Sequence, residues 1–144
     1  MRFKLDYPPV ACPRPKVTRF GTYYPKKYTE WKKRATNDLK HLAEANVLFC
    51  RFILKRPKAM KKTGDTTPHT KRPDLDNFIK AICDSLPFDD SRIHTIVAQK
   101  VYSSEKDTPG IEIMLLKGEI ELFTGQNPPT QGKRAEECKN TYKI

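Results

Sequence analysis

The sequence is short of several features that define common classes of protein. Among its 144 residues, no apolar run reaches the about 18 residues that a membrane-spanning helix needs. The opening residues also show no apolar stretch of the kind that marks a secretory signal peptide. We therefore expect a cytoplasmic protein that binds no membrane.

Cysteine is scarce, and its four copies, Cys12, Cys50, Cys83 and Cys138, are scattered without a C-x-x-C pair. Structural zinc sites usually take their ligands in closely spaced couples. The spacing therefore disfavours zinc and fits four reduced thiols. We expect no small-molecule cofactor either.

Acidic residues are in short supply as well. The chain has 28 Lys or Arg against 17 Asp or Glu, which gives a net charge of +11. Such an excess predicts attraction to polyanions, with nucleic acid first and an anionic membrane surface second. The length fits one domain with a hydrophobic core of its own.

Apolar patterning predicts a chain that alternates strands with helices. The expected strands cover residues 3–7, 47–54, 93–102 and 111–116, and the last two read as a hairpin. The expected helices cover residues 30–45, with Thr29 as N-cap, and residues 77–86, with Asp76 as N-cap. Residues 1–117 would form the domain. Residues 118–144 are polar and read as a poorly ordered or partner-binding extension.

Two segments carry much of the positive charge. Residues 13–34 contain eight Lys or Arg and one acid, Glu30, while residues 55–72 contain seven and one acid, Asp65. Aromatic side chains are interleaved with the basic ones in the first segment. Two interpretations of it stay open: a solvated loop whose aromatics pack on the body, or an arm that binds nucleic-acid phosphates.

Four acids flank the second predicted helix, although the protein as a whole is basic. Asp74 and Asp76 stand at its start, and Asp89 and Asp90 follow its end. Oxygen-only clusters suit Mg²⁺, with Mn²⁺ as a substitute, and a metal in a basic protein indicates phosphodiester chemistry. The helix is about 15 Å long, and the link after it spans at most about 14 Å. The second pair can therefore only just reach back to bind the same ion as the first pair. If closure fails within one chain, either the helix ends early or the second pair serves elsewhere.

Three other polar residues near this motif allow more than one interpretation. Lys80 lies one helical turn after Asp76, where its ammonium would either stabilise charge on a reacting phosphate or pair with Asp84. His69 and His94 would be metal ligands, general bases or neither.

The acidic run resembles the signature of the RusA family of Holliday-junction resolvases. The matching residues are Arg72-Pro73-Asp74-Leu75-Asp76-Asn77, Lys80, Asp84-Ser85-Leu86 and Asp89-Asp90-Ser91-Arg92-Ile93, with Lys100 on the next strand. The early stretches Pro13-Arg14-Pro15-Lys16 and Tyr24-Pro25-Lys26 are similar to the family's basic loop. The resemblance covers about residues 3–116.

This resemblance implies a small α/β (α+β) domain in which a mixed β-sheet packs against two main helices. It also implies a homodimer from a bacterium, phage or prophage that resolves four-way junction DNA during recombination and repair. The reaction would be Mg²⁺-dependent paired nicking that leaves a 5′-phosphate and a 3′-hydroxyl.

The same resemblance assigns roles to the acidic motif. Asp74, Asp76 and Asp90 would be the catalytic metal ligands, with Asp89 beside them and Lys80 as the active-site lysine. We expect the DNA-binding surface to include basic residues from both positively charged segments: Arg14, Lys16, Arg19, Lys26, Lys71 and Arg72.

Two features depart from the family pattern. The link between the helix and the second acidic pair is short, and the extension at residues 118–144 has no counterpart in compact members. Alternatives to a resolvase therefore remain: a metal-dependent nuclease on other branched or duplex DNA, a non-catalytic DNA-binding module, or a phage protein that binds a protein partner.

Overall fold

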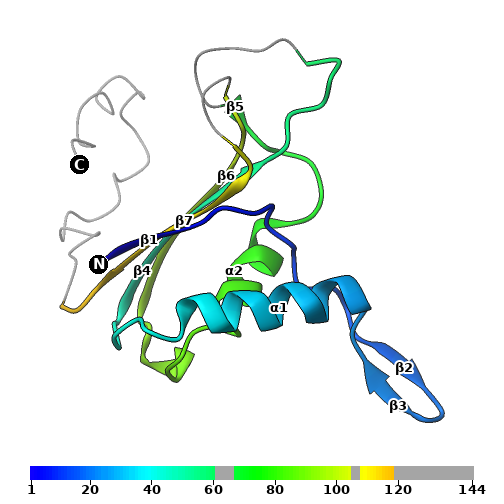
Figure 1. Ribbon diagram of the computed structural model, residues 1–144, viewed down its shortest axis with the longest axis horizontal. Coiled ribbons are helices and arrows are strands. Elements are labelled where there is room, and N and C mark those ends of the chain that lie inside the picture. The colour runs from blue at the N-terminus through cyan, green and yellow to red at the C-terminus, as the bar shows by residue number, and fades with distance from the viewer. Residues whose placement is uncertain (61–66, 105–107, 119–144) are drawn as a thin grey trace, which may run out of the picture.

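Five strands form one sheet, and two helices lie against one of its faces (Figure 1). The computed structural model of the protein describes residues 1–60, 67–104 and 108–118. The strands run in the spatial order β1-β7-β4-β6-β5. Their bounds are β1 Arg2–Leu5, β4 Val47–Leu54, β5 Thr67–Pro68, β6 Thr95–Tyr102 and β7 Gly110–Leu116. Because β4 pairs parallel with β6 and antiparallel with β7, the sheet is mixed, as expected.

Three helical elements and a small hairpin complete the described chain. The helices are α1 Lys26–Leu39, α2 Leu75–Cys83 and the 3₁₀ turn η1 Asp90–Arg92. A separate two-stranded hairpin pairs β2 Lys16–Thr18 with β3 Gly21–Tyr23. In Figure 1 this hairpin projects from the N-terminal end of α1, away from the sheet.

The core forms between the two helices and the sheet. β4 is the central strand, and its alternate residues Leu48, Cys50 and Phe52 face the helices in one buried cluster. The Phe52 ring lies 5.3 Å from that of Phe78 on α2, measured between centroids. Each such aromatic contributes about 1.5–3 kcal/mol through burial. This packing fixes where α2, and the acids at its ends, stand relative to the sheet.

β7 needs a glycine at its start. A Cβ atom on Gly110 would lie 2.6 Å from the carbonyl oxygen of Leu5 at the end of β1. No side chain tolerates that approach to backbone, so Gly110 permits the β1–β7 pairing.

The prediction that the last two strands form a hairpin is wrong. β6 and β7 follow each other in the chain, but β4 lies between them and pairs with both. The physical reason is burial, because β4 is the most apolar strand and gains most from a partner on each side.

α1 begins four residues before its expected start, so Thr29 is not its N-cap. The carbonyl oxygen of Pro25 accepts hydrogen bonds from the backbone N–H groups of Tyr28 and Thr29, at 3.0 and 3.1 Å. Proline presets the φ that a helix start requires, and Tyr28 is buried in the core, 2% exposed. The helix ends at Leu39 rather than at residue 45.

α2 also begins earlier than expected. Asp74, not Asp76, is the N-cap, and the helix ends at Cys83 with Asp84 as its C-cap. The chain enters from Pro73 with Asp74 extended, at φ −71° and ψ 152°, so helical geometry starts at the next residue. Asp76 consequently lies inside the first turn.

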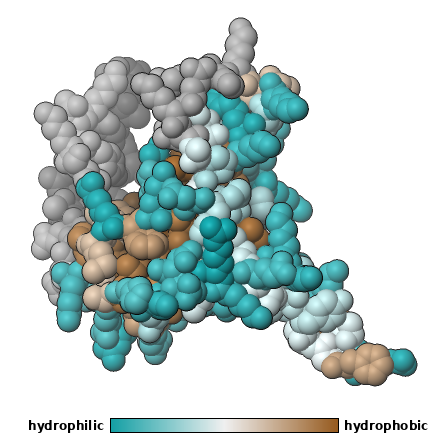
Figure 2. All heavy atoms as spheres, viewed as in Figure 1, coloured by the Kyte–Doolittle hydropathy of each residue, from teal (hydrophilic) through white to brown (hydrophobic). Residues whose placement is uncertain are grey.

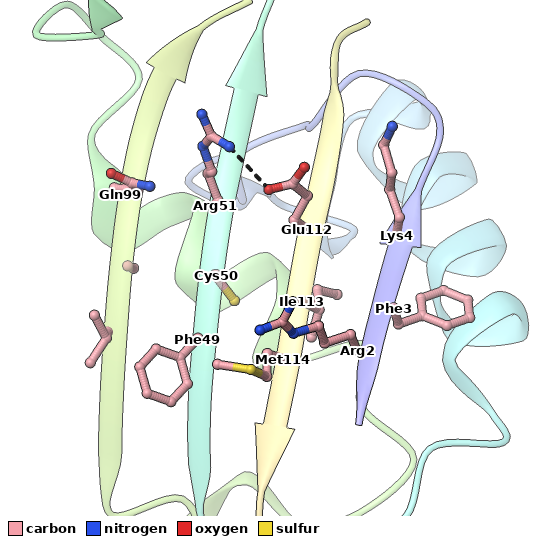
Figure 3. A pocket seen from close by; sticks show the side chains of 12 residues that line it. Arg2, Phe3, Lys4, Phe49, Cys50, Arg51, Gln99, Glu112, Ile113 and Met114 are labelled. Carbon is pink, nitrogen blue, oxygen red and sulfur yellow. Dashed lines mark hydrogen bonds and ion pairs between the residues drawn. The ribbon is translucent and has the colours of Figure 1, made fainter. Parts of the chain in front are cut away.

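The face of the sheet opposite the helices carries an open hollow of about 750 Å³ over β1, β4, β6 and β7 (Figure 3). Arg51 of β4 forms an ion pair there with Glu112 of β7, at 3.3 Å. Arg2 and Lys4 of β1 add two further cations. Apart from Gly118, the extension expected at residues 118–144 lies outside the described residues.

Candidate active site at the ends of helix α2

The N-terminal end of α2 presents two carboxylates. Asp74 is the N-cap residue, yet its side chain makes no capping hydrogen bond, and Asp76 is the second residue of the helix. Both residues are exposed, and neither carboxylate has a hydrogen-bond or ion-pair partner in the described part of the chain. The free N–H groups and the dipole of the helix favour negative charge at this position. The two carboxylates are therefore available to bind a cation.

The loop that leads into Asp74 is tied to the sheet by a lysine. Lys100 on β6 donates from Nζ to the backbone carbonyl oxygens of Lys71 and Pro73, each at 2.5 Å. In return, the carbonyl oxygen of Lys100 accepts a hydrogen bond from the N–H of His69, at 3.0 Å. Sequence reasoning placed Lys100 in the motif but gave it no role. The feature of the sequence that could have indicated a role for Lys100 is a lysine at a position of the strand that faces the helices.

The C-terminal end of α2 presents a different acid. Asp84 forms ion pairs with Lys80, one turn earlier, at 3.5 Å and with Lys32 of α1 at 3.8 Å. The nearby Asp84 carboxylate raises the pKa of Lys80 above its usual value. Pairing with Asp84, one of the two interpretations of Lys80, is therefore observed.

The second acidic pair lies beyond this same end. The side chain of Asp89 caps η1 by accepting a hydrogen bond from the N–H of Ser91, at 2.9 Å, and that bond lowers the pKa of Asp89. Asp90 opens η1. The pKa of the Cys83 thiol is raised, first by burial and then by the charge of Asp90. Asp90 therefore lies near the end of α2, where Cys83 is the last residue.

The two acidic pairs consequently stand at opposite ends of α2. A helix of nine residues is about 13 Å long. Among residues 1–60, 67–104 and 108–118, no three His, Cys, Asp or Glu side chains gather into a group that could hold a metal. The donors still suit Mg²⁺ chemically, because Asp74, Asp76 and Asp90 are exposed carboxylates without cation partners in the described chain. Their joint coordination of one ion stays a prediction.

All six expected DNA-binding residues are exposed. Arg14, Lys16 and Arg19 lie on or next to the β2–β3 hairpin, and Lys71 and Arg72 lie on the loop before Asp74. Lys26, the first residue of α1, pairs with Glu30 at 3.7 Å.

The two basic segments border the same end of α2. The N–H of Cys12 donates to the carbonyl oxygen of Asn77, in the first turn of the helix, at 2.9 Å. Cys12 directly precedes the first segment, so this bond fixes where that segment begins relative to α2, while the second segment runs directly into Asp74. Lys71 and Arg72 thus stand directly before the two available carboxylates in the chain.

A comparison with known families decides what kind of protein this is. The family model described as Endodeoxyribonuclease RusA matches residues 6–116, which is more than half of the chain. The chain belongs to the RusA family. Membership implies an endodeoxyribonuclease of the kind that resolves Holliday junctions in recombination. No curated protein matches the chain closely enough to count as a relative.

The match to RusA coincides with the fold described above. It ends at residue 116, where β7 also ends, and it starts just after β1, so the other four strands of the sheet, both helices and the acidic motif lie inside it. Within the described residues, no helix is long and apolar enough to cross a membrane.

The two histidines of this RusA-family chain differ in their surroundings. The ring of His69 lies 4.5 Å from that of Tyr102, measured between centroids. Burial and the charge of Lys100 lower the pKa of His69, which keeps its ring neutral near pH 7. The Nδ1 atom of His94 lies 2.9 Å from the hydroxyl of Thr95, and this histidine is exposed. Neither arrangement assigns a catalytic role.

Proposed function

We propose that this RusA-family protein is a Mg²⁺-dependent resolvase that introduces paired nicks into four-way junction DNA. The observation that carries the proposal is the N-terminal end of α2. Two carboxylates without partners, Asp74 and Asp76, stand there between two basic segments. In a protein with 28 basic residues, an unpaired acid at such a place indicates a binding site for a cation.

The acids would hold the metal through oxygen atoms only. Mg²⁺ commonly binds one or two protein carboxylates and completes its shell with water and substrate phosphates. Asp74 and Asp76 fit that pattern, and we assign Asp90 and then Asp89 as further ligands. When bound, Mg²⁺ polarises the scissile phosphate and lowers the pKa of the attacking water, and Mn²⁺ can substitute.

The basic residues around this site would bind and orient the DNA. Arg14, Lys16 and Arg72, with Arg19, Lys26 and Lys71, would contact phosphates, which position a duplex without reading its sequence. Lys80 is 58% exposed at its side chain and held only by a surface ion pair, so it is free to turn from Asp84 to the reacting phosphate. The products would be a 5′-phosphate and a 3′-hydroxyl.

Paired nicking requires two equivalent sites. A homodimer with two-fold symmetry supplies them, because a four-way junction has symmetry-related strands of like polarity. We include this dimer in the proposal, together with a role in recombination and repair of bacterial, phage or prophage DNA. With DNA as its substrate, the protein would act in the cytoplasm.

A cutting assay tests the proposal. A synthetic four-way junction and a linear duplex of the same sequence are incubated with the protein in Mg²⁺ and in EDTA. We expect paired nicks in the junction with Mg²⁺, none with EDTA, and little cutting of the duplex. Equal cutting of duplex would instead establish a general nuclease. Junction binding without nicks at any Mg²⁺ concentration would establish a non-catalytic module.

A further inference from the structure

The β2–β3 hairpin is a projection that packing does not explain. Every residue of its two strands is exposed, and it points away from the body of the protein (Figure 1). Within the described residues it is anchored at its base, where the ring of Tyr24 lies 5.4 Å from that of Tyr28 on α1. A two-stranded hairpin in water is marginally stable by itself. Its shape therefore depends on local interactions.

Those local interactions fix the tip. The hydroxyl of Thr18 donates to the carbonyl oxygen of Gly21, at 3.0 Å, and accepts a hydrogen bond from the N–H of Phe20, at 3.3 Å. Gly21 has φ +124°, a backbone conformation that L side chains rarely adopt. The turn thus holds Arg19 and Phe20 in a defined position at the end of the hairpin.

The tip displays a large apolar side chain. Phe20 is 86% exposed, and Val17 on β2 is 79% exposed. The guanidinium of Arg19 lies 4.6 Å from the centre of the Phe20 ring. Figure 2 shows hydrophobic surface at the far end of the projection. A phenyl group held out on a structured turn has contact surface to offer and nothing in the described chain to cover it.

The charge around the tip selects the kind of partner. From residue 13 to residue 24 the chain carries Arg14, Lys16 and Arg19 and no acid. Cations interleaved with aromatic rings suit a nucleic acid, whose phosphates pair with the cations and whose bases stack on the rings. A paired, stacked duplex offers no free base face, so the ring would find its partner where stacking is interrupted.

A second copy of the chain is a poorer partner for this tip. The open hollow on the sheet is the apolar surface that could receive Phe20. However, Arg2, Lys4 and Arg51 line that hollow. Glu112, the one acid among its lining residues, is already paired with Arg51, and the neighbouring Asp6 is already paired with Lys4, so Arg2 is left as an uncompensated cation in the described chain. Docking the basic hairpin there would bring like charges together.

We propose that the β2–β3 hairpin is a branch-point probe. Phe20 stacks on a base that is unstacked at the crossover of a DNA junction, while Arg14, Lys16 and Arg19 bind the phosphates on either side. This inference rests on the proposed function and adds to it the feature by which a junction is told from a linear duplex.

Two variants and a matched control test the probe. Phe20→Ala removes the ring, Phe20→Trp keeps an aromatic face, and Val17→Ser alters another exposed apolar residue of the same hairpin. Dissociation constants are measured in EDTA for a four-way junction and a linear duplex of one sequence. We expect Phe20→Ala to weaken junction binding roughly tenfold and duplex binding less than about twofold. Phe20→Trp and Val17→Ser should both stay close to wild type.

A second readout follows the base itself. With 2-aminopurine at the branch point, wild-type protein should change its fluorescence on binding, and Phe20→Ala should not. Because Phe20 is exposed, thermal unfolding of all variants should match wild type. If Phe20→Ala weakens binding to the junction and to the duplex equally, the probe is overturned. It is also overturned if Phe20→Ala changes the sedimentation of the protein but keeps its preference for the junction, because Phe20 would then contact a second copy of the chain.

The outcomes separate this inference from the proposed function. Wild-type protein that cuts junctions while Phe20→Ala binds them normally would refute the probe alone. Wild-type protein that never cuts in Mg²⁺ while Phe20→Ala loses junction preference would refute the resolvase and leave the probe standing.

Discussion

The two ends of helix α2 carry the same kind of side chain in opposite circumstances. At the C-terminal end, Asp84 pairs with two lysines. Beyond that end, Asp89 caps a 3₁₀ turn, and Asp90 has no cation partner in the described chain. At the N-terminal end, Asp74 and Asp76 have no partner in the described chain, although Asp74 is itself a cap residue.

The difference teaches how to separate structural from functional acids in a basic protein. With 28 Lys and Arg available, an acid is not left unpaired for want of a cation. Asp84 stabilises local structure through its two ion pairs, which explains it fully. Asp74 and Asp76 face the dipole of α2 with their oxygens free, which suits a ligand that is absent from the chain itself.

The largest effect should come from neutralising an unpartnered acid. We expect Asp76→Asn to retain junction binding and to lower the cleavage rate by more than about a hundredfold, because the loss even of residues that support metal ligands commonly costs 10- to 100-fold. Cleavage is measured on a synthetic four-way junction in Mg²⁺, and binding in EDTA.

Asp90→Asn refines the same test. If Asp90 joins Asp76 on one metal, the two variants should lose cleavage alike and need more Mg²⁺ for half-maximal rate. A wild-type rate for Asp76→Asn would remove the metal assignment altogether.

A smaller effect should follow from releasing the loop that carries Asp74. In Lys100→Met the carbonyl oxygens of Lys71 and Pro73 lose their shared donor, so the loop is held less firmly. We expect cleavage at saturating junction to fall roughly tenfold, since misplaced catalytic groups react slowly, while junction affinity changes little. Lys117→Met removes the same charge from an exposed lysine and serves as the control. Equal losses in both variants would point to net charge instead.

The parts of the fold governed by local pattern were predictable from sequence. The strand predicted at residues 47–54 is confirmed at both ends, because the polar residues on either side of a continuous apolar run mark where the buried strand begins and ends. The start of α1 was misjudged because the carbonyl of Pro25 captures two amides before Thr29 can act as a cap. The pairing of β7 was misjudged because it depends on β4, which is more than fifty residues away in the chain.

The candidate site divides in the same way. Its acids follow from residue type and spacing, whereas the role of Lys100 depends on a contact across 27 and 29 residues. The β2–β3 hairpin was missed because each strand has three residues, too few for a period to show. The proposed convergence of Asp90 with Asp76 depends on how η1 packs, which spacing along the chain does not fix.

The smallest effect should come from the partnered acid, Asp84. Asp84→Asn removes two ion pairs that are partly exposed, so the free energy of unfolding in urea should fall by less than about 1 kcal/mol.

The pH dependence of this effect follows from the raised pKa of Lys80. The pairing of Lys80 with Asp84 stabilises the fold below the ordinary lysine pKa of about 10.4, and this stabilisation is lost as pH rises through the pKa of Lys80 in the folded protein. The difference between wild type and variant should thus stay constant from about pH 6 to about pH 9. Junction cleavage should stay within about threefold of wild type, because Asp84 holds Lys80 in the resting protein and touches no reacting atom. A loss of cleavage as large as that of Asp76→Asn would show that the two ends of α2 act as one site.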